Sequence, residues 1–169
     1  DRDTALVLSL KDILPIFRQG LIALQADLAQ LTQAHGGGAL MGRTRMQAAL
    51  PITVADRLVT WRMPLERHLA RLDEVRARVL CVQCGGPVGL GAGGAALAAQ
   101  LGLAAPDKSW HVMRDGFAEL ANWLSLVSGS LGKMGMDISL MTQQGVDEMR
   151  LRAGGSSSAM PHKQNPILA

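Results

Sequence analysis

Apolar residues recur at three- and four-residue steps over most of the chain, which is the period of an amphipathic helix. The spacing predicts a first helix of about thirty residues, roughly 45 Å long, over residues 3–33. A second long helix is predicted over residues 53–82, which Pro64 should kink or end. A third is predicted over residues 109–142. The apolar positions of the first helix are Leu6, Leu10, Ile13, Leu14, Phe17, Leu21, Leu24, Leu28 and Leu31.

Two glycine-rich segments interrupt this pattern. The first, "HGGGALMGRTRMQAALP", separates the first two helices. The second lies within the uncharged residues 80–106, a run long enough to span a bilayer. Its glycines and Pro87 instead predict a buried turn followed by a short helix over residues 95–101.

Helices of this length are unusual in a compact domain, where about a dozen residues is typical. We therefore expect an all-α fold built as an elongated bundle of long helices. The apolar positions of "FAELANWLSLVSGSLGKMGMDISLM" occupy more than one stripe of the helix, which predicts that other subunits cover part of it.

Composition agrees with this class. Hydrophobic residues make up 48% of the 169 residues and aromatic residues only 3%, a mixture that favours helices over sheets. The net charge is +3, and because the charges are interleaved, a site for small anions fits better than a nucleic-acid groove. The start carries no secretory leader, which predicts a cytoplasmic protein whose N-terminal part is missing here.

Cys81 and Cys84 form one C-x-x-C pair without a second pair. A zinc or redox site is one interpretation, and two reduced thiols at a helix end are the favoured one.

The closing stretch "GGSSSAMPHKQNP" has the parts of an anion site that also moves protons. Gly154 and Gly155 let backbone N–H groups approach a ligand, and Lys163 adds a full charge. Asn165 followed by Pro166 is typical of the start of a helix, whose positive end would face the same ligand. The alternative interpretation is a polar linker with a capping asparagine.

Residues 157–166, "SSAMPHKQNP", closely resemble the signature G-S-S-x-M-P-x-K-x-N-P of the fumarase/aspartase superfamily, although Ser156 replaces its glycine. The stretches "DTALVL", "GRTRMQAALPIT" and "SWHVMRDGFAELANWLSLVSGSLGKMGMDI" also resemble the superfamily, in the same order. The resemblance covers nearly the whole chain. It is strongest for the branch of bacterial 3-carboxy-cis,cis-muconate cycloisomerases.

The resemblance implies the central helical domain of the fumarase/aspartase fold over residues 1–169, with the N-terminal and C-terminal parts of the family chain absent. It also implies an enzyme that needs no metal or organic cofactor and converts 3-carboxy-cis,cis-muconate to 4-carboxymuconolactone, in the breakdown of protocatechuate. Ser157 would be the general base, and Lys163 and Asn165 would bind substrate carboxylates. Ser158 and Met160 of the signature would also contact substrate.

Further substrate contacts are expected from Thr44, Gln47 and Arg43. Arg45 stands where most lyases of the superfamily have a histidine linked to acid catalysis, a loss that the cycloisomerase branch shares. It could bind the anionic substrate or be a solvated arginine. His111 could contact substrate or a neighbouring subunit, or cap a helix.

The resemblance further implies a homotetramer whose active sites combine motifs from three subunits, with small dicarboxylates or tricarboxylates as substrates. The fragment alone is expected to be inactive. Two alternatives remain: an adenylosuccinate lyase-type β-elimination enzyme, and a catalytically silent helical oligomerisation module.

Overall fold

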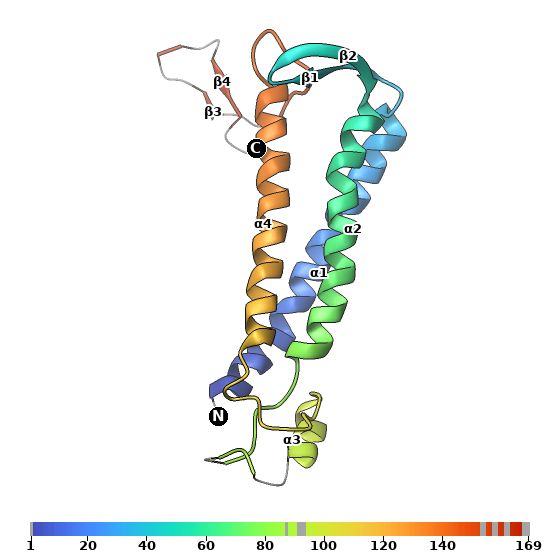
Figure 1. Ribbon diagram of the computed structural model, residues 1–169. Coiled ribbons are helices and arrows are strands. Elements are labelled where there is room, and N and C mark those ends of the chain that lie inside the picture. Colours follow the sequence, from blue (N-terminus) through green and yellow to red (C-terminus); the bar gives the residue numbers. More distant parts are fainter. Residues whose placement is uncertain are drawn as a thin grey trace.

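A computed structural model of the chain describes residues 2–86, 88–90, 94–152, 155–156, 159–160 and 163–166. Within these residues the helices are α1 (Arg2–His35), α2 (Val54–Val79), α3 (Gly94–Leu101) and α4 (Asp115–Met141). The strands are β1 (Ala39–Thr44), β2 (Gln47–Thr53), β3 (Gly155–Ser156) and β4 (Gln164–Asn165). Three long helices form an elongated bundle, with the β1–β2 hairpin across one end and α3 at the other (Figure 1). The predicted helical fold class is confirmed, and the two short hairpins are additions that the sequence analysis did not predict.

The core of the bundle follows a seven-residue repeat. α2 packs against both α1 and α4, and Phe17 of α1 meets Trp123 of α4 edge to face, with ring centroids 6.1 Å apart. Buried side chains at seven-residue intervals are typical of knobs-into-holes packing between nearly parallel helix axes. The buried residues in this register are Val7, Leu14, Leu21 and Leu28 of α1, Leu58, Leu65, Leu72 and Val79 of α2, and Leu120 and Val127 of α4.

Pro64 does not end the second helix, contrary to one of the two expected outcomes. α2 runs from Val54 to Val79 with Pro64 inside it. Trp61 and Leu65, on either side of the proline, are 4% and 1% exposed. Their burial against the neighbouring helices holds both turns in place and offsets the hydrogen bond that proline cannot donate.

The third helix begins later than expected because its predicted first residues bond to another segment. Gln83 donates from Nε2 to Ser109 Oγ over 2.8 Å and accepts a 2.9 Å bond from the Trp110 backbone N–H. The Trp110 indole donates to the Val82 carbonyl over 2.9 Å. The segment before Asp115 is therefore tied to the chain that leaves α2, and α4 begins only at Asp115.

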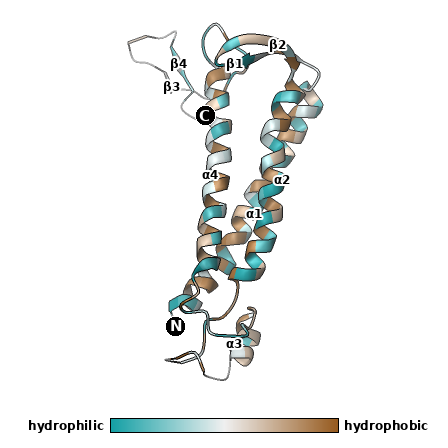
Figure 2. Cartoon of the chain, in the orientation of Figure 1, coloured by the Kyte–Doolittle hydropathy of each residue, from teal (hydrophilic) through white to brown (hydrophobic). Residues whose placement is uncertain are grey.

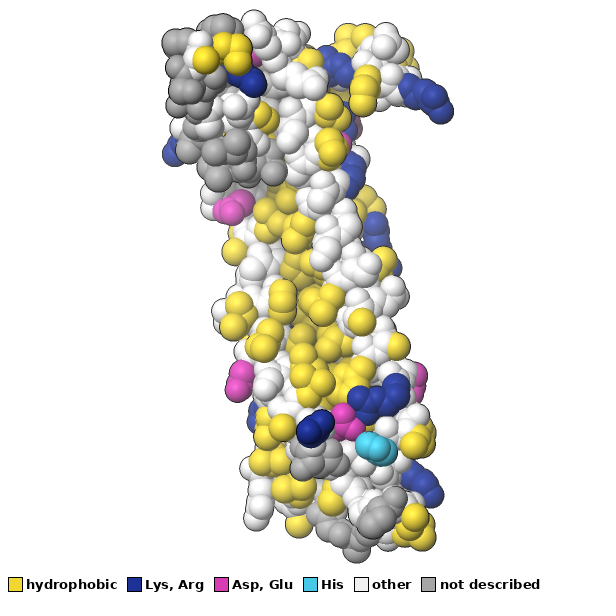
Figure 3. Space-filling view, turned by 90° about the vertical axis from the view of Figure 1, so that its left-hand side faces the viewer, with side chains coloured by type: hydrophobic (Ala, Val, Ile, Leu, Met, Phe, Trp, Pro, Cys, Tyr) yellow, Lys and Arg dark blue, Asp and Glu magenta, His cyan; other side chains and the backbone are white. Residues whose placement is uncertain are grey.

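Hydrophobic positions recur along all three long helices (Figure 2), and a good part of them stays uncovered. A band of apolar side chains runs along the length of the bundle on the face that Figure 3 shows. Large apolar residues exposed on α1 and α4 include Leu6, Ile13, Ile16, Phe17, Ile22, Leu31, Leu126, Leu131 and Met136.

No helix within the described residues is both long and apolar enough to cross a membrane. The uncharged run 80–106 instead contains α3, close to the predicted short helix.

Candidate functional site

Residues 42–47, "GRTRMQ", open the stretch "GRTRMQAALPIT" and are here called the second motif. They form the tip of the β1–β2 hairpin. The strands are antiparallel, and Arg43 lies opposite Ala48 while Thr44 lies opposite Gln47. A register shift between Met41 and Arg43 marks a bulge at Gly42. A Cβ atom on Gly42 would lie 2.7 Å from the Leu50 carbonyl oxygen, so the strands approach this closely only because the residue is glycine.

The two residues at the turn of this hairpin have left-handed backbones. Arg45 has φ of 46° and Met46 has φ of 65°, the pattern of a type I′ turn, which usually takes Asn or Gly. Non-glycine residues in this region are strained. The side chains of Thr44, Arg45 and Gln47 are all exposed, so the predicted substrate contacts of this motif are accessible at one end of the bundle.

Arg43 is paired with an acidic residue that sequence reasoning missed. Its Nη1 forms an ion pair with Glu148 Oε1, between residues 105 positions apart. The same nitrogen donates a 3.2 Å bond to the Met41 carbonyl. The second motif is thereby joined to the segment that leads from α4 into the signature. No local sequence signal indicates this pair, because the two residues belong to distant segments.

A pocket of about 220 Å³ lies between the hairpin and the C-terminal end of α4. Its lining includes Arg43, Met46, Arg57, Asp137 and Glu148. Arg57 Nη1 is 3.8 Å from Asp137 Oδ2, and Arg57 Nε is buried without a hydrogen-bond partner among the described residues. The pocket thus holds two guanidinium groups beside two carboxylates.

Asp137 is the anchor at the base of this pocket. Burial acts to raise its pKa, but hydrogen bonds from Lys133 and Trp61 and the charges of Lys133 and Arg57 outweigh burial and hold the pKa below its ordinary value. The carboxylate therefore stays ionised at neutral pH and keeps the cations of α2 and α4 together.

The signature segment is partly described. β3 and β4 pair antiparallel, with Gly155 opposite Asn165 and Ser156 opposite Gln164, so its two ends meet beside α4 (Figure 1). Lys163 and Met160 are exposed, and the Lys163 N–H donates to the Met160 carbonyl over 2.9 Å. Ser157 and Ser158 lie outside the described residues.

Asn165 belongs to β4, an extended conformation that N-cap residues also adopt, so the expected role of Asn165 as the cap of a new helix stays a prediction. Pro166 follows it without helical structure, and residues 167–169, where that helix would continue, lie outside the described residues.

His111 lies at the other end of the bundle, in the segment before α4, away from both motifs. Its Nδ1 is 3.5 Å from Asp3 Oδ2, and its side chain is 72% exposed. Arg114 binds the same carboxylate through two nitrogens, at 2.8 and 3.1 Å, and this bonding lowers the pKa of Asp3. Within one chain, His111 is therefore not brought together with Arg43, Thr44 or Lys163.

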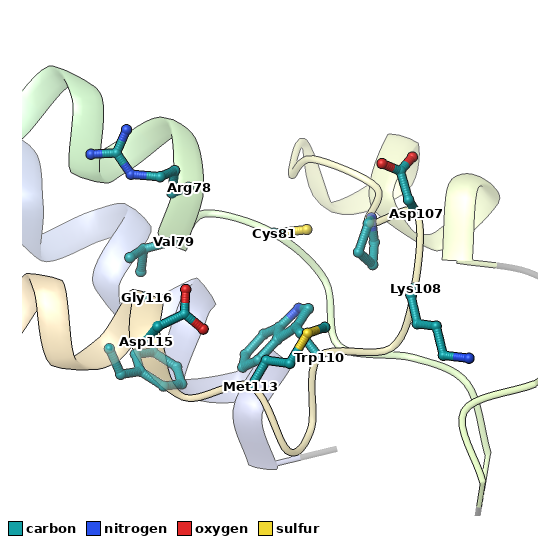
Figure 4. Close-up of a pocket in the computed structure, with 11 residues that line it drawn as sticks. Arg78, Val79, Cys81, Asp107, Lys108, Trp110, Met113, Asp115 and Gly116 are labelled. Atoms are coloured by element: carbon teal, nitrogen blue, oxygen red, sulfur yellow. The ribbon is translucent and has the colours of Figure 1, made fainter.

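A larger pocket of about 400 Å³ also lies at this opposite end. Figure 4 shows Trp110 and Met113 at its floor, with Arg78, Asp107 and Lys108 around it. Among the described residues, none of those expected to bind substrate lines it. Cys81 lines it as a free thiol, as Cys84 is also free, and burial raises the pKa of Cys81. In the part of the chain that the structure describes, no cluster of His, Cys, Asp and Glu side chains could hold a metal ion.

Comparisons of sequence and of structure with known proteins both find 3-carboxy-cis,cis-muconate cycloisomerases. The chain is 44% identical to a 3-carboxy-cis,cis-muconate cycloisomerase of Pseudomonas aeruginosa, over 98% of this chain and 38% of the relative. It is 40% identical to the Pseudomonas putida cycloisomerase, over 98% of this chain and 42% of the relative. The crystal structure of the 3-carboxy-cis,cis-muconate lactonizing enzyme from Pseudomonas putida superposes with a TM-score of 0.86 at 41% identity, over 98% of this chain and 38% of that one.

The chain thus spans about two fifths of the length of the curated relatives that it matches. A family model described as "Lyase" matches residues 2–169. The chain belongs to this lyase family, and its resemblance to the fumarase/aspartase superfamily, seen first in its motifs, is confirmed.

Proposed function

We propose that the protein containing this chain is a cycloisomerase that converts 3-carboxy-cis,cis-muconate to 4-carboxymuconolactone. The observation that carries the proposal is the 44% identity to the Pseudomonas aeruginosa enzyme over 98% of the chain. The exposed second motif and the signature at the same end of the bundle support it.

In the proposed reaction one carboxylate oxygen of the substrate bonds to a carbon of the conjugated diene. The electron pair moves into a neighbouring carboxylate, and the resulting carbanion takes a proton from Ser157. In reverse, Ser157 removes that proton and the ring carboxylate leaves. Lys163, Asn165 and nearby backbone N–H groups stabilise the charge that collects on the carboxylate oxygens.

Arg45 argues against the alternative β-elimination lyase. A guanidinium does not release its proton in proteins, so Arg45 cannot replace a histidine as a general acid. In the cycloisomerase the leaving carboxylate of the reverse reaction needs no proton. Arg45 is exposed at the hairpin tip, where its charge can attract a trianionic substrate.

We further propose a cytoplasmic homotetramer with active sites shared between subunits. The apolar residues left exposed along α1 and α4 give a large surface for other copies. His111 and the second motif, at opposite ends of one chain, would meet in such a site only if they came from different subunits.

The test uses the complete gene product and follows the loss of diene absorbance of 3-carboxy-cis,cis-muconate. We expect turnover that Ser157→Ala abolishes and that Ser9→Ala, an exposed serine of α1, leaves intact. Turnover of adenylosuccinate instead would favour the β-elimination alternative. Inactivity on both substrates would favour the silent oligomerisation module.

A further inference from the structure

We infer that Glu148 is a positioning residue, which holds Arg43 so that the free edge of its guanidinium receives a carboxylate of the substrate. The inference rests on the proposed function only for the substrate class, a small polycarboxylate.

The first support is the way in which the nitrogens of Arg43 are used. Nη1 bonds to both Glu148 Oε1 and the Met41 carbonyl oxygen. Nε and Nη2 have no partner among the described residues. These two nitrogens form one edge of the planar guanidinium, and this edge matches a carboxylate with two parallel hydrogen bonds.

The second support is that the acidic partner is itself held firmly. The side chain of Glu148 is only 11% exposed. Its backbone N–H donates to the Met141 carbonyl over 2.9 Å, and the next N–H, of Met149, donates to the same oxygen over 3.3 Å. The end of α4 therefore determines where the Glu148 carboxylate lies, and that carboxylate determines where the Arg43 guanidinium lies.

The third support is the bulge at Gly42. A bulge turns the following side chain away from the regular alternation of a strand. Arg43 is the first residue after the register shift, and its side chain, 30% exposed, reaches the pocket beneath the hairpin. The backbone and Glu148 thus act together on the same side chain.

The local charge still favours an anion after these pairs are formed. The positive charges of Arg43 and Arg57 in the pocket lining balance the negative charges of Asp137 and Glu148. Lys133, which binds Asp137 from outside the lining, adds one further positive charge. A free arginine loses much side-chain entropy when it binds a ligand, and Arg43 has already lost it to Glu148. The pair therefore prepares a cation for binding without neutralising the pocket as a whole.

The test measures binding of tricarballylate, an unreactive tricarboxylate, to the complete gene product by calorimetry. We expect Glu148→Gln to weaken binding by about tenfold, the size of one charged hydrogen bond, and Glu148→Asp to weaken it less. In an Arg43→Gln background, Glu148→Gln should add no further loss, because Glu148 acts through Arg43.

The matched control is Glu119→Gln, which breaks the Arg78–Glu119 ion pair at the opposite end of the bundle. It should leave tricarballylate binding unchanged. Equal binding by Glu148→Gln and the unsubstituted protein, additive losses in the double variant, or no binding of tricarballylate to the unsubstituted protein would each overturn the inference. If Glu148→Gln does not fold, Glu148→Asp alone and in the Arg43→Gln background decides by the same criteria. Turnover of 3-carboxy-cis,cis-muconate is measured separately, so that failure of the proposed function is distinguished from failure of this inference.

Discussion

The indole Nε1 of Trp61 donates a 2.7 Å hydrogen bond to Oδ2 of Asp137, joining α2 to α4 directly below the second motif. Lys133 binds the same oxygen, and Arg57 lies 3.8 Å from it. The Asp137 carboxylate thus interacts with an indole and a guanidinium of α2 and with an ammonium group of α4. The pocket beneath the hairpin depends on it.

Asp137→Asn should lower the free energy of unfolding by about 1–3 kcal/mol, because Lys133 and Arg57 lose the charge that they share. Chemical denaturation of the complete gene product measures the loss. Asp73→Asn, which breaks an exposed pair with Arg18, is the control and should cost less than about 0.5 kcal/mol. Equal losses in the two variants would show that Asp137 is no anchor.

Gly42→Ala should destabilise the hairpin by about 1–3 kcal/mol and weaken substrate binding, since the added methyl group meets the Leu50 carbonyl at 2.7 Å. Gly37→Ala adds the same methyl group where nothing lies within 4 Å. Thermal unfolding and KM are compared for the two variants. A Gly42→Ala protein with unchanged KM would mean that the bulge does not orient Arg43.

Met46→Gly should raise the free energy of unfolding by about 1 kcal/mol, because glycine adopts a positive φ without the strain of a Cβ atom. Met46 is 75% exposed, so that little packing is lost. The comparison is Met63→Gly, inside α2, which should lower the same quantity by about 1 kcal/mol. A fall in stability for Met46→Gly would contradict the turn geometry.

The free energy of unfolding should fall as the pH drops below 6.5, the ordinary histidine pKa, because of His68. Burial, with smaller contributions from Arg71 and Arg67, lowers its pKa from the ordinary value of 6.5. The unfolded chain therefore binds a proton more readily than the folded one. This contribution to stability is complete above pH 6.5 and is lost as the pH falls towards the lowered value.

His68 bonds to Ser130 Oγ through Nε2 at 2.8 Å, and its Nδ1 is buried without a partner among the described residues. His68→Gln should remove most of the pH dependence, and His35→Gln, at an exposed position, should not. The same slope in both variants would locate the proton uptake elsewhere.

The long helices could be predicted from sequence because their buried residues repeat within single segments. The first helix, expected over residues 3–33, is α1, Arg2–His35. Thr53 was close to the expected start of the second helix, and its side chain caps α2 by accepting from Asp56 N. A helical repeat and an N-terminal cap can both be recognised from residues that are neighbours in the sequence.

The β1–β2 hairpin was not predicted, because most of its residues are exposed and none is buried, so neither strand has a core-facing side. Its turn also lacks the usual Asn or Gly. Glu148, Arg57 and Asp137 were missed for another reason: they reach the pocket only when distant segments fold together. The motifs predicted Arg43 as a candidate site residue, and the folded chain added the charged residues that line the same pocket.

The seven-residue spacing of the buried Leu14, Leu21 and Leu28 ties the length of the bundle to whole repeats. Deleting one residue from the middle of α1 would turn each later leucine by about 100° away from the core. Deleting seven would restore the register and shorten the helix by about 10 Å, provided that α2 and α4 lost the same length. The distance between the hairpin end and the α3 end of the bundle can therefore change only by whole seven-residue repeats, inserted or deleted in all three helices together.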